Sequence, residues 1–228
     1  MKESPATHQE SVISTLAERA GVYFLFARLF REAPTPELLR ELVQCQWLSS
    51  AERFAGDGQQ SQVCDIDPAE DPHWLDAAEE IAVDYARLFA VPGEQSVHPY
   101  ESAYCDTLSI DTSAACSAYF ENQRPIVGLP GFIGGPSASA LARAYAGSGF
   151  ELDPACHELP DHLSIELEFM GRLLERGDVD ATKVFFQEHL GQWAFRCLED
   201  VKRNVPSGFY RIAADTLTTF LRHEQEVL

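Results

Sequence analysis

Apolar residues recur along most of the chain at the spacing of one helix face, and strand-like alternation is nearly absent. Between residues 11 and 30, apolar side chains return every three or four positions, close to the 3.6-residue period of an α-helix. Similar patterns predict helices over residues 36–48, 71–88, 111–122, 138–146, 161–176, 180–203 and 207–226. We therefore expect an all-α fold, a single globular domain over residues 1–228 with about eight or more helices joined by short loops.

Proline and glycine mark where these helices begin and end. Thr35 and Pro36 are typical of an N-cap and a first helical position, and Gly177 stands where a C-cap glycine belongs. Residues 124–137 hold three prolines and four glycines, so the sequence predicts no regular structure there. This segment is the candidate for a hinge or subdomain boundary. It would also serve as the swap hinge if the chain forms a domain-swapped homodimer rather than a monomer.

The charge balance narrows the class of partner. With 17 basic and 36 acidic residues, the formal net charge is −19, which argues against binding nucleic acid or anionic lipid. A basic partner suits such a surface, although acidic side chains also serve solubility alone. No apolar run approaches the ~20 residues that span a bilayer, and residues 1–10 do not resemble an export signal. We expect a cytoplasmic protein without stable membrane insertion.

The motifs of common metal, nucleotide and hydrolase sites are missing from the sequence. Its six cysteines include no C-x-x-C pair, which indicates free thiols in a cytoplasmic protein. The glycine-rich run at residues 128–135 has no following Lys-Ser or Lys-Thr pair, so it is neither a phosphate loop nor a dinucleotide-binding turn. No nucleophile elbow and no paired acid and base carboxylates stand out. The sequence therefore predicts no metal site, no catalytic residues and no permanently bound cofactor.

Asp161 and His162 lie at the start of a predicted helix and admit two interpretations. The structural one is that Asp161 caps the helix, which is the commoner role of such a residue. The functional one is that Asp161 orients His162, or holds it charged, beside a groove for a ligand. His162 and Glu166 share a helix face, but two side chains do not make a metal site.

A second candidate segment begins at Pro99. Tyr100 and Tyr104 stand on either side of Glu101 in this segment, which is predicted to be a loop. Loops on a rigid scaffold are where binding residues concentrate, and tyrosine offers a large contact area with a polar end. The alternative is that one tyrosine fills the core while the other is merely exposed.

Several short motifs, in this order along the chain, resemble the TorD/DmsD family of chaperones. They are Arg19-x-x-x-Tyr23, Tyr85-x-x-Leu88-Phe89, Glu101-Ser102-Ala103-Tyr104, Ala142-Arg143-x-Tyr145, Glu158-x-x-Asp161-His162, Glu188-His189-Leu190-x-x-Trp193 and Phe209-Tyr210. Each motif alone has modest specificity, but together they span most of the chain. One motif reads Glu-Leu-Pro-Asp-His, whereas relatives often have Glu-Pro followed by acidic residues. That difference bears on how strongly the site contacts arginine.

The resemblance implies an all-helical chaperone that acts on a client molybdoenzyme of the DMSO-reductase type. Members bind the client's twin-arginine leader, and in some cases its apo form, and hold it back from export until the molybdenum cofactor is inserted. The partner implied is the catalytic subunit of a molybdenum oxidoreductase. The residues implied to border the peptide groove are Tyr85, Phe89, Pro99, Tyr100, Glu101, Ser102, Tyr104, Asp161, His162 and Glu166. Among them, Glu101, Asp161 and Glu166 are expected to meet the arginines by bidentate hydrogen bonds.

The sequence leaves two alternatives open. A related branch of assembly chaperones serves nitrate-reductase-type enzymes that are not exported, and the identity of the client would separate the branches. Family members have also been linked to guanine and molybdopterin nucleotides. Transient contact with GTP or a molybdopterin nucleotide, or a nucleotide-hydrolysing activity, is therefore the alternative from another class. The sequence carries no phosphate loop and no set of Mg²⁺-binding carboxylates for that activity.

Overall fold

The computed structural model describes residues 15–44, 71–110, 126–130 and 133–228. The described elements begin with α1 (Leu16–Arg31), α2 (Pro36–Gln44), α4 (Asp71–Tyr85), the π-helical turn η2 (Ala86–Ala90), α5 (Glu101–Cys105), β1 (Thr107–Ile110) and β2 (Ile126–Pro130). They continue with α6 (Pro136–Gly147), α7 (Leu163–Glu175), α8 (Val179–Phe185), the π-helical turn η4 (Phe186–Leu190), α9 (Gly191–Asn204) and α10 (Phe209–Val227). The all-α class is confirmed, while the helix predicted over residues 111–122 lies outside the described residues.

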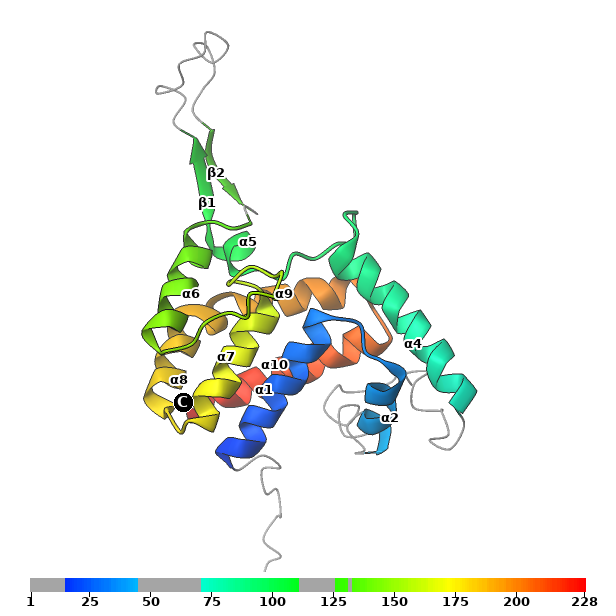
Figure 1. The fold of residues 1–228 in the computed structure, drawn as a ribbon. Coiled ribbons are helices and arrows are strands. Elements are labelled where there is room, and N and C mark those ends of the chain that lie inside the picture. The colour runs from blue at the N-terminus through cyan, green and yellow to red at the C-terminus, as the bar shows by residue number, and fades with distance from the viewer. Residues whose placement is uncertain (1–14, 45–70, 111–125, 131–132) are drawn as a thin grey trace, which may run out of the picture.

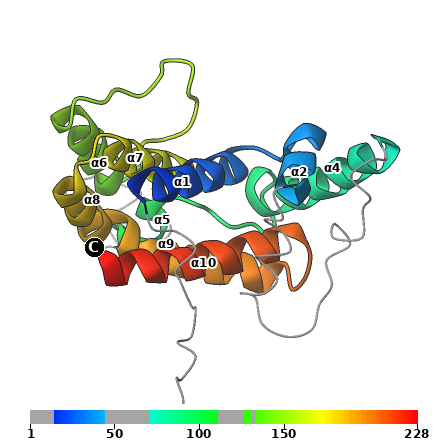
Figure 2. The same cartoon turned by 90° about the horizontal axis from the view of Figure 1, so that it is seen from below.

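The helices form two main layers around one apolar core. In Figure 2, α1 and α7 lie side by side in one layer, and α9 and α10 lie in the other. Fully buried rings fill the core, among them Tyr23 and Phe26 from α1, Trp193 from α9 and Tyr210 from α10. Burying a large apolar side chain stabilises a fold by about 1.5–3 kcal/mol. This core therefore fixes the positions at which loops leave the helices.

Local capping sets where the helices begin and end. α1 starts after Thr15, whose Oγ1 accepts the N–H of Glu18 at 3.2 Å, while the Glu18 carboxylate accepts the N–H of Thr15 at 2.9 Å. This capping box begins the helix later than the apolar spacing predicted, and residues 11–14 lie outside the described residues. α7 ends as predicted, because Gly177 has a φ of +73° and its N–H donates to the carbonyl of Leu174 at 3.0 Å.

One strand, β2, lies within residues 124–137 and corrects the prediction that this segment holds no regular structure. β1 and β2 pair antiparallel, with Thr107 opposite Pro130 and Ile110 opposite Ile126, and this hairpin projects from the helical body in Figure 1. The sequence did not predict the strands, because their pairing joins separate segments and no local periodicity records it. α6 then begins at Pro136, inside the same segment. The role of the segment as a hinge stays a prediction.

A π-helical turn interrupts the single helix predicted over residues 180–203. α8 runs into η4 and then into α9 without a break in the chain. Gly191 accommodates the turn, because a Cβ there would lie 2.7 Å from the carbonyl oxygen of Phe186. This turn carries His189, and the second one, η2, follows α4 and carries Phe89. Such turns shift the direction of the side chains that follow them and are frequent at functional sites.

A buried ion pair ties the first described helix to the last. Arg19 on α1 donates to both carboxylate oxygens of Glu224 on α10, at 2.7 and 2.8 Å, and the Tyr23 hydroxyl donates to the same carboxylate at 3.1 Å. The hydrogen bond that Arg19 donates to Glu224 raises the pKa of Arg19, and burial raises the pKa of Tyr23 well above its ordinary value. Glu224 is fully buried, so neither charge could be buried here without the other.

Candidate functional site

The segment that begins at Pro99 is fastened to the start of α7. The N–H of Leu163 donates to the carbonyl of Pro99 at 2.8 Å, and Tyr100 and His162 form an isolated antiparallel bridge beside it. The rings of Tyr100 and His162 also meet edge to face, with centroids 4.9 Å apart. The structure thus brings together the two segments that the sequence singled out, although they are distant along the chain.

Asp161 holds this segment from inside the protein. Its buried carboxylate accepts hydrogen bonds from the hydroxyl of Ser102 and, at 3.1 Å, from the N–H of Ser102. Its backbone carbonyl accepts the N–H of Glu101 at 2.9 Å, and the Ser102 hydroxyl in turn accepts the N–H of Gly134 at 3.1 Å. Asp161 is therefore a helix cap, as one interpretation predicted, but it caps α5 and not α7. Its Oδ1 is buried without a hydrogen-bond partner among the described residues.

His162, rather than Asp161, is the N-cap of α7. Its Nδ1 accepts the N–H of Ser164 at 3.1 Å and lies 2.8 Å from the Ser164 hydroxyl. Burial lowers the pKa of His162 from 6.5 to about 4, which outweighs the opposing influence of Glu158 and Asp161. This lowered pKa keeps the ring neutral near pH 7, which does not favour the interpretation that Asp161 holds it charged. The stability that this neutral ring contributes is present above pH 6.5 and is lost as the pH falls toward 4.

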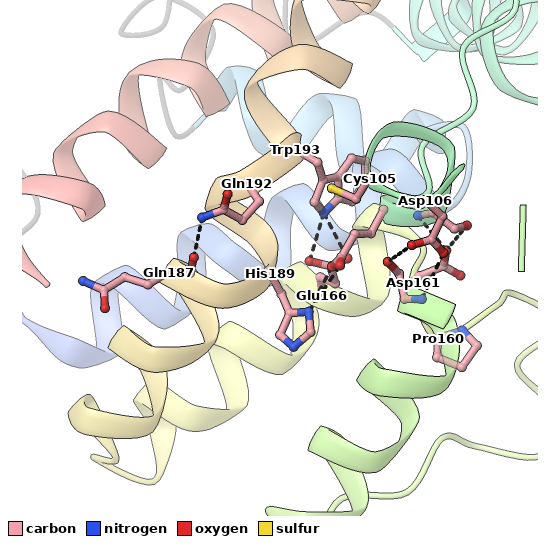
Figure 3. A network of polar contacts seen from close by, with 12 residues as sticks. Cys105, Asp106, Pro160, Asp161, Glu166, Gln187, His189, Gln192 and Trp193 are labelled. Atoms are coloured by element: carbon pink, nitrogen blue, oxygen red, sulfur yellow. Dashed lines mark hydrogen bonds and ion pairs between the residues drawn. The ribbon is translucent and has the colours of Figure 1, made fainter. Parts of the chain in front are cut away.

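Glu166 lies in the first turn of α7 within a cluster of buried carboxyl groups (Figure 3). Both of its oxygens accept the indole N–H of Trp193, at 3.1 and 3.2 Å. Burial, followed by the charge of Glu101, holds the pKa of Glu166 well above its ordinary value. Glu166 therefore retains a proton at pH values where exposed glutamates are ionised. Glu101 completes the cluster, with its carboxylate 3.1 Å from Nδ1 of His189 on η4.

A half-exposed aromatic cluster borders the same loop. The rings of Tyr85 and Phe89 lie 5.3 Å apart, and both contact Tyr210 of α10. The Tyr85 hydroxyl donates to the carbonyl of Arg31 at 2.5 Å, and burial raises the pKa of Tyr85 to about 12. These contacts fix two of the predicted site residues at the junction of α1, η2 and α10.

Glu158 joins this aromatic cluster to Tyr100. The Tyr100 hydroxyl donates to the Glu158 carboxylate at 2.8 Å, and both side chains are half-buried. Burial and this hydrogen bond raise the pKa of Tyr100, and the charge of Glu158 also contributes to the raised pKa of Tyr85. Glu158 therefore lies near both tyrosines, at the edge of the site.

Tyr104 contacts α9 instead of the aromatic cluster. Its ring stacks on Trp193 with centroids 5.6 Å apart, and its hydroxyl donates to Asp200 at 3.0 Å. The guanidinium of Arg196 lies over the Tyr104 ring, 5.5 Å from its centroid. Tyr104 thus helps to hold α5 against α9.

The structure divides the predicted site residues into two groups. The buried ones are Pro99, Glu101, Ser102, Asp161, His162 and Glu166, and the half-exposed ones are Tyr85, Phe89, Tyr100 and Tyr104. In this conformation the three carboxyl groups expected to meet client arginines face the interior. The acidic side chain at the edge is Glu158, which was part of the quoted motif but not among the predicted site residues.

The chemistry available at this site is hydrogen bonding, aromatic packing and charge. Within the described part of the chain, no group of three or more His, Cys, Asp or Glu side chains is arranged to hold a metal ion. Among the helices of residues 15–44, 71–110 and 133–228, none is both long and apolar enough to cross a membrane.

The chain is similar to proteins named Chaperone protein TorD. It is 24% identical over 164 residues to the one from Vibrio parahaemolyticus, a match that covers 67% of this chain and 66%, just under two thirds, of that relative. The one from Psychrobacter sp. strain PRwf-1 is 26% identical over 227 residues, covering 92% of this chain and 91% of the relative. The one from Salmonella bongori is 24% identical over 221 residues, covering 94% and 92%.

A solved structure and a family model also match. The structure, of a proposed redox enzyme maturation protein from Archaeoglobus fulgidus, is 19% identical, covers 98% of this chain and 99% of its own, and has a TM-score of 0.47. The family model described as Nitrate reductase delta subunit matches residues 60–199, which is more than half of the chain. That range includes every predicted site residue, from Tyr85 to Glu166. The chain therefore belongs to the nitrate reductase delta subunit family and is a TorD-like member of it.

Proposed function

We propose that this chain is a cytoplasmic chaperone of molybdoenzyme maturation. It binds the twin-arginine leader, the apo form, or both, of a DMSO-reductase-type catalytic subunit, and it frees the client for export after cofactor insertion. Family membership and the TorD relatives support the coarser part of this proposal. The observation that carries the finer part is the edge at which Tyr85, Phe89 and Tyr100 stay half-exposed beside Glu158. The chain acts by binding, and no bond-making step is assigned to it.

The edge suits an arginine side chain. A guanidinium group pairs with a carboxylate through two hydrogen bonds and stacks on aromatic faces. Glu158 supplies the carboxylate, and Tyr85 and Tyr100 supply the rings. The net charge of −19 adds a long-range attraction for a basic leader. In this account the buried carboxyl groups act by positioning the loop rather than by touching the client.

Calorimetric titration with the leader peptide of the molybdoenzyme encoded beside this protein tests the proposal. We expect micromolar or tighter binding, and weaker binding when both arginines are replaced by lysine, because an ammonium group lacks the planar fork of a guanidinium. Glu158→Gln keeps the acceptor for Tyr100 but removes the charge, so it should weaken binding by about tenfold. The matched control, Glu188→Gln on η4, changes an exposed carboxylate and should leave binding unchanged. Binding of neither peptide would reject leader recognition.

A client that is not exported is the second candidate. The observation in its favour is the description of the matching family model, Nitrate reductase delta subunit. A purified client that lacks a leader, and that binds the Glu158→Gln variant as tightly as the unmodified protein, would favour this candidate. Transient contact with GTP or a molybdopterin nucleotide stays a prediction, as does the choice between monomer and domain-swapped homodimer.

A further inference from the structure

A pocket of about 370 Å³ opens between α7 and the segment of residues 150–156 that precedes it. Phe150, Ile165 and Phe169 form much of its apolar wall, and Cys156 lines it as a half-buried thiol. Ligand sites commonly have volumes of about 300–1,000 Å³ and mostly apolar walls. No predicted site residue lines this pocket, so it is a separate feature of the surface.

Arg31 connects the pocket to the candidate site. The residue lines the pocket, and its Nε lies 3.4 Å from the hydroxyl of Ser164, which in turn contacts His162. Its backbone carbonyl accepts the hydrogen bond of Tyr85. One residue therefore touches both features.

The charges around the pocket favour a basic ligand over an anionic one. The guanidinium groups of Arg31 and Arg172 both pair with Glu168, at nitrogen–oxygen distances of 2.7 and 3.5 Å. An anion would have to displace that carboxylate. Glu151 and Asp153 also line the pocket, and they form no ion pair within the residues that the structure describes. Arg176 is a further cation beside the pocket, and its guanidinium lies 3.7 Å from the centroid of the Phe150 ring and donates to the carbonyl of Ser148. Among the described residues, the charges without an ion pair that line the pocket itself are those of Glu151 and Asp153, and they stand beside an apolar wall.

We infer that this pocket receives an apolar side chain of the client leader, with a basic neighbour of that side chain on Glu151 and Asp153. The inference rests on the proposed function and extends it to a second contact surface. A twin-arginine leader joins a basic segment to an apolar stretch, so it supplies both kinds of group in one peptide. The apolar contact provides affinity, and the two carboxylates fix the register of the peptide along α7.

Protection of Cys156 from alkylation tests the inference in the unmodified pocket. The rate of iodoacetamide labelling at Cys156 is measured by mass spectrometry, with and without leader peptide at a concentration that saturates binding in calorimetry. We expect the rate to fall by at least about tenfold, because a thiol must be accessible to react. A Val184→Cys variant provides the reference thiol, since Val184 is exposed on α8 and does not line the pocket. Its labelling rate should not change.

The outcomes separate the two proposals. Saturating peptide that leaves the Cys156 rate unchanged would overturn the pocket contact and leave leader binding intact. A peptide that does not bind at all would overturn both. Equal protection of Cys156 and of the thiol at position 184 would also overturn the pocket contact, because it would report a change throughout the protein.

Filling the pocket gives a second measurement. Cys156→Phe adds a ring to the pocket, whereas Val184→Phe adds the same ring to the exposed face of α8. We expect the first variant to bind the leader about tenfold more weakly and the second to bind it normally. A leader with its apolar residues next to the arginines changed to alanine should bind both variants and the unmodified protein alike. Equal leader affinity of the two variants would contradict the inference.

Discussion

The two buried polar clusters of this protein bury carboxyl groups in different ways. Around Glu224, the guanidinium of Arg19 supplies a full compensating charge and two hydrogen bonds. In the cluster around Glu166, no lysine or arginine of the described residues pairs with Glu166, Glu101 or Asp161. Instead, the indole of Trp193 donates to Glu166 and the hydroxyl of Ser102 donates to Asp161. Glu166 also retains a proton, which lowers the charge that has to be buried. The first cluster joins helices, and the second holds the loop at the candidate site.

This difference indicates which property each cluster should control, global stability or client affinity. The ion pair joins the start of α1 to the end of α10, whereas the client-binding edge lies where α1 ends and α10 begins. Loss of the ion pair should therefore lower global stability and leave that edge unchanged. A cluster that holds α5 against α7 fixes the loop of Tyr100, so its loss should change client affinity as well. Four substitutions test this division.

The largest effect is expected from Glu224→Gln. Removal of the carboxylate leaves the Arg19 charge buried without its partner, which should lower the free energy of unfolding by about 3–5 kcal/mol. Urea unfolding measures this loss, and the affinity for the leader should stay unchanged in the folded fraction. The double variant Arg19→Met with Glu224→Met removes both charges and should recover most of the stability. A fall in leader affinity in that double variant would break the proposed division.

Asp161→Ala should have the next largest effect on stability and, unlike Glu224→Gln, should also weaken binding. It leaves the N–H and hydroxyl of Ser102 without their acceptor, at a cost of about 2–3 kcal/mol. Release of the loop should reduce leader affinity, measured by calorimetry at a temperature where the variant is folded. Asp161→Asn keeps an acceptor oxygen at this position and is the matched control, with a smaller expected change in both quantities.

Glu166→Gln should change the dependence of stability on pH more than stability itself. The pKa of Glu166 is higher in the folded protein than in the unfolded chain. Above the ordinary pKa of glutamate, folding therefore requires uptake of a proton at Glu166, and the contribution of this group to stability falls as pH rises. Glutamine cannot titrate, and it keeps an acceptor for Trp193. The variant should therefore gain about 1 kcal/mol or more relative to the unmodified protein between pH 5 and pH 8. A constant difference across that range would show that Glu166 is already ionised.

The smallest effect is expected from Arg28→Gln, which removes an exposed ion pair of α1. Arg28 and Glu32 lie 3.9 Å apart with side chains 49% and 63% exposed. Solvent screening limits such pairs to about 0–0.5 kcal/mol. Thermal unfolding of the Arg28→Gln and Glu224→Gln variants, measured side by side, would compare the stability lost with an exposed pair and with a buried one. A loss comparable to that of Glu224→Gln would mean that burial does not decide the value of these pairs.

The sequence predicted the helices well because helical periodicity is local. The pattern over residues 161–176 corresponds to α7, Leu163–Glu175, and the pattern over 207–226 corresponds to α10, Phe209–Val227. The β1–β2 hairpin was missed because a strand is defined by a partner elsewhere in the chain. The π-helical turn η4 was missed because its apolar spacing still resembles that of an α-helix over so short a stretch.

For the candidate site, the sequence identified the segments but not which residues their side chains contact. Asp161 was correctly linked to the capping of N–H groups, but its partner is Ser102, 59 positions earlier, and no pattern near Asp161 could indicate that. The sequence left open whether His162 is charged, because it does not reveal how completely the ring is buried. Glu158 reaches the site edge because Tyr100, from another segment, binds its carboxylate.

The contact of Arg19 with Glu224 also has a consequence for biosynthesis. The two residues are 205 positions apart, so α1 emerges from the ribosome long before the carboxylate that neutralises it exists. Until then the guanidinium must remain hydrated, and α1 cannot settle against α10. The core therefore closes only after α10 has been translated, and a product truncated before Glu224 would be unable to close it.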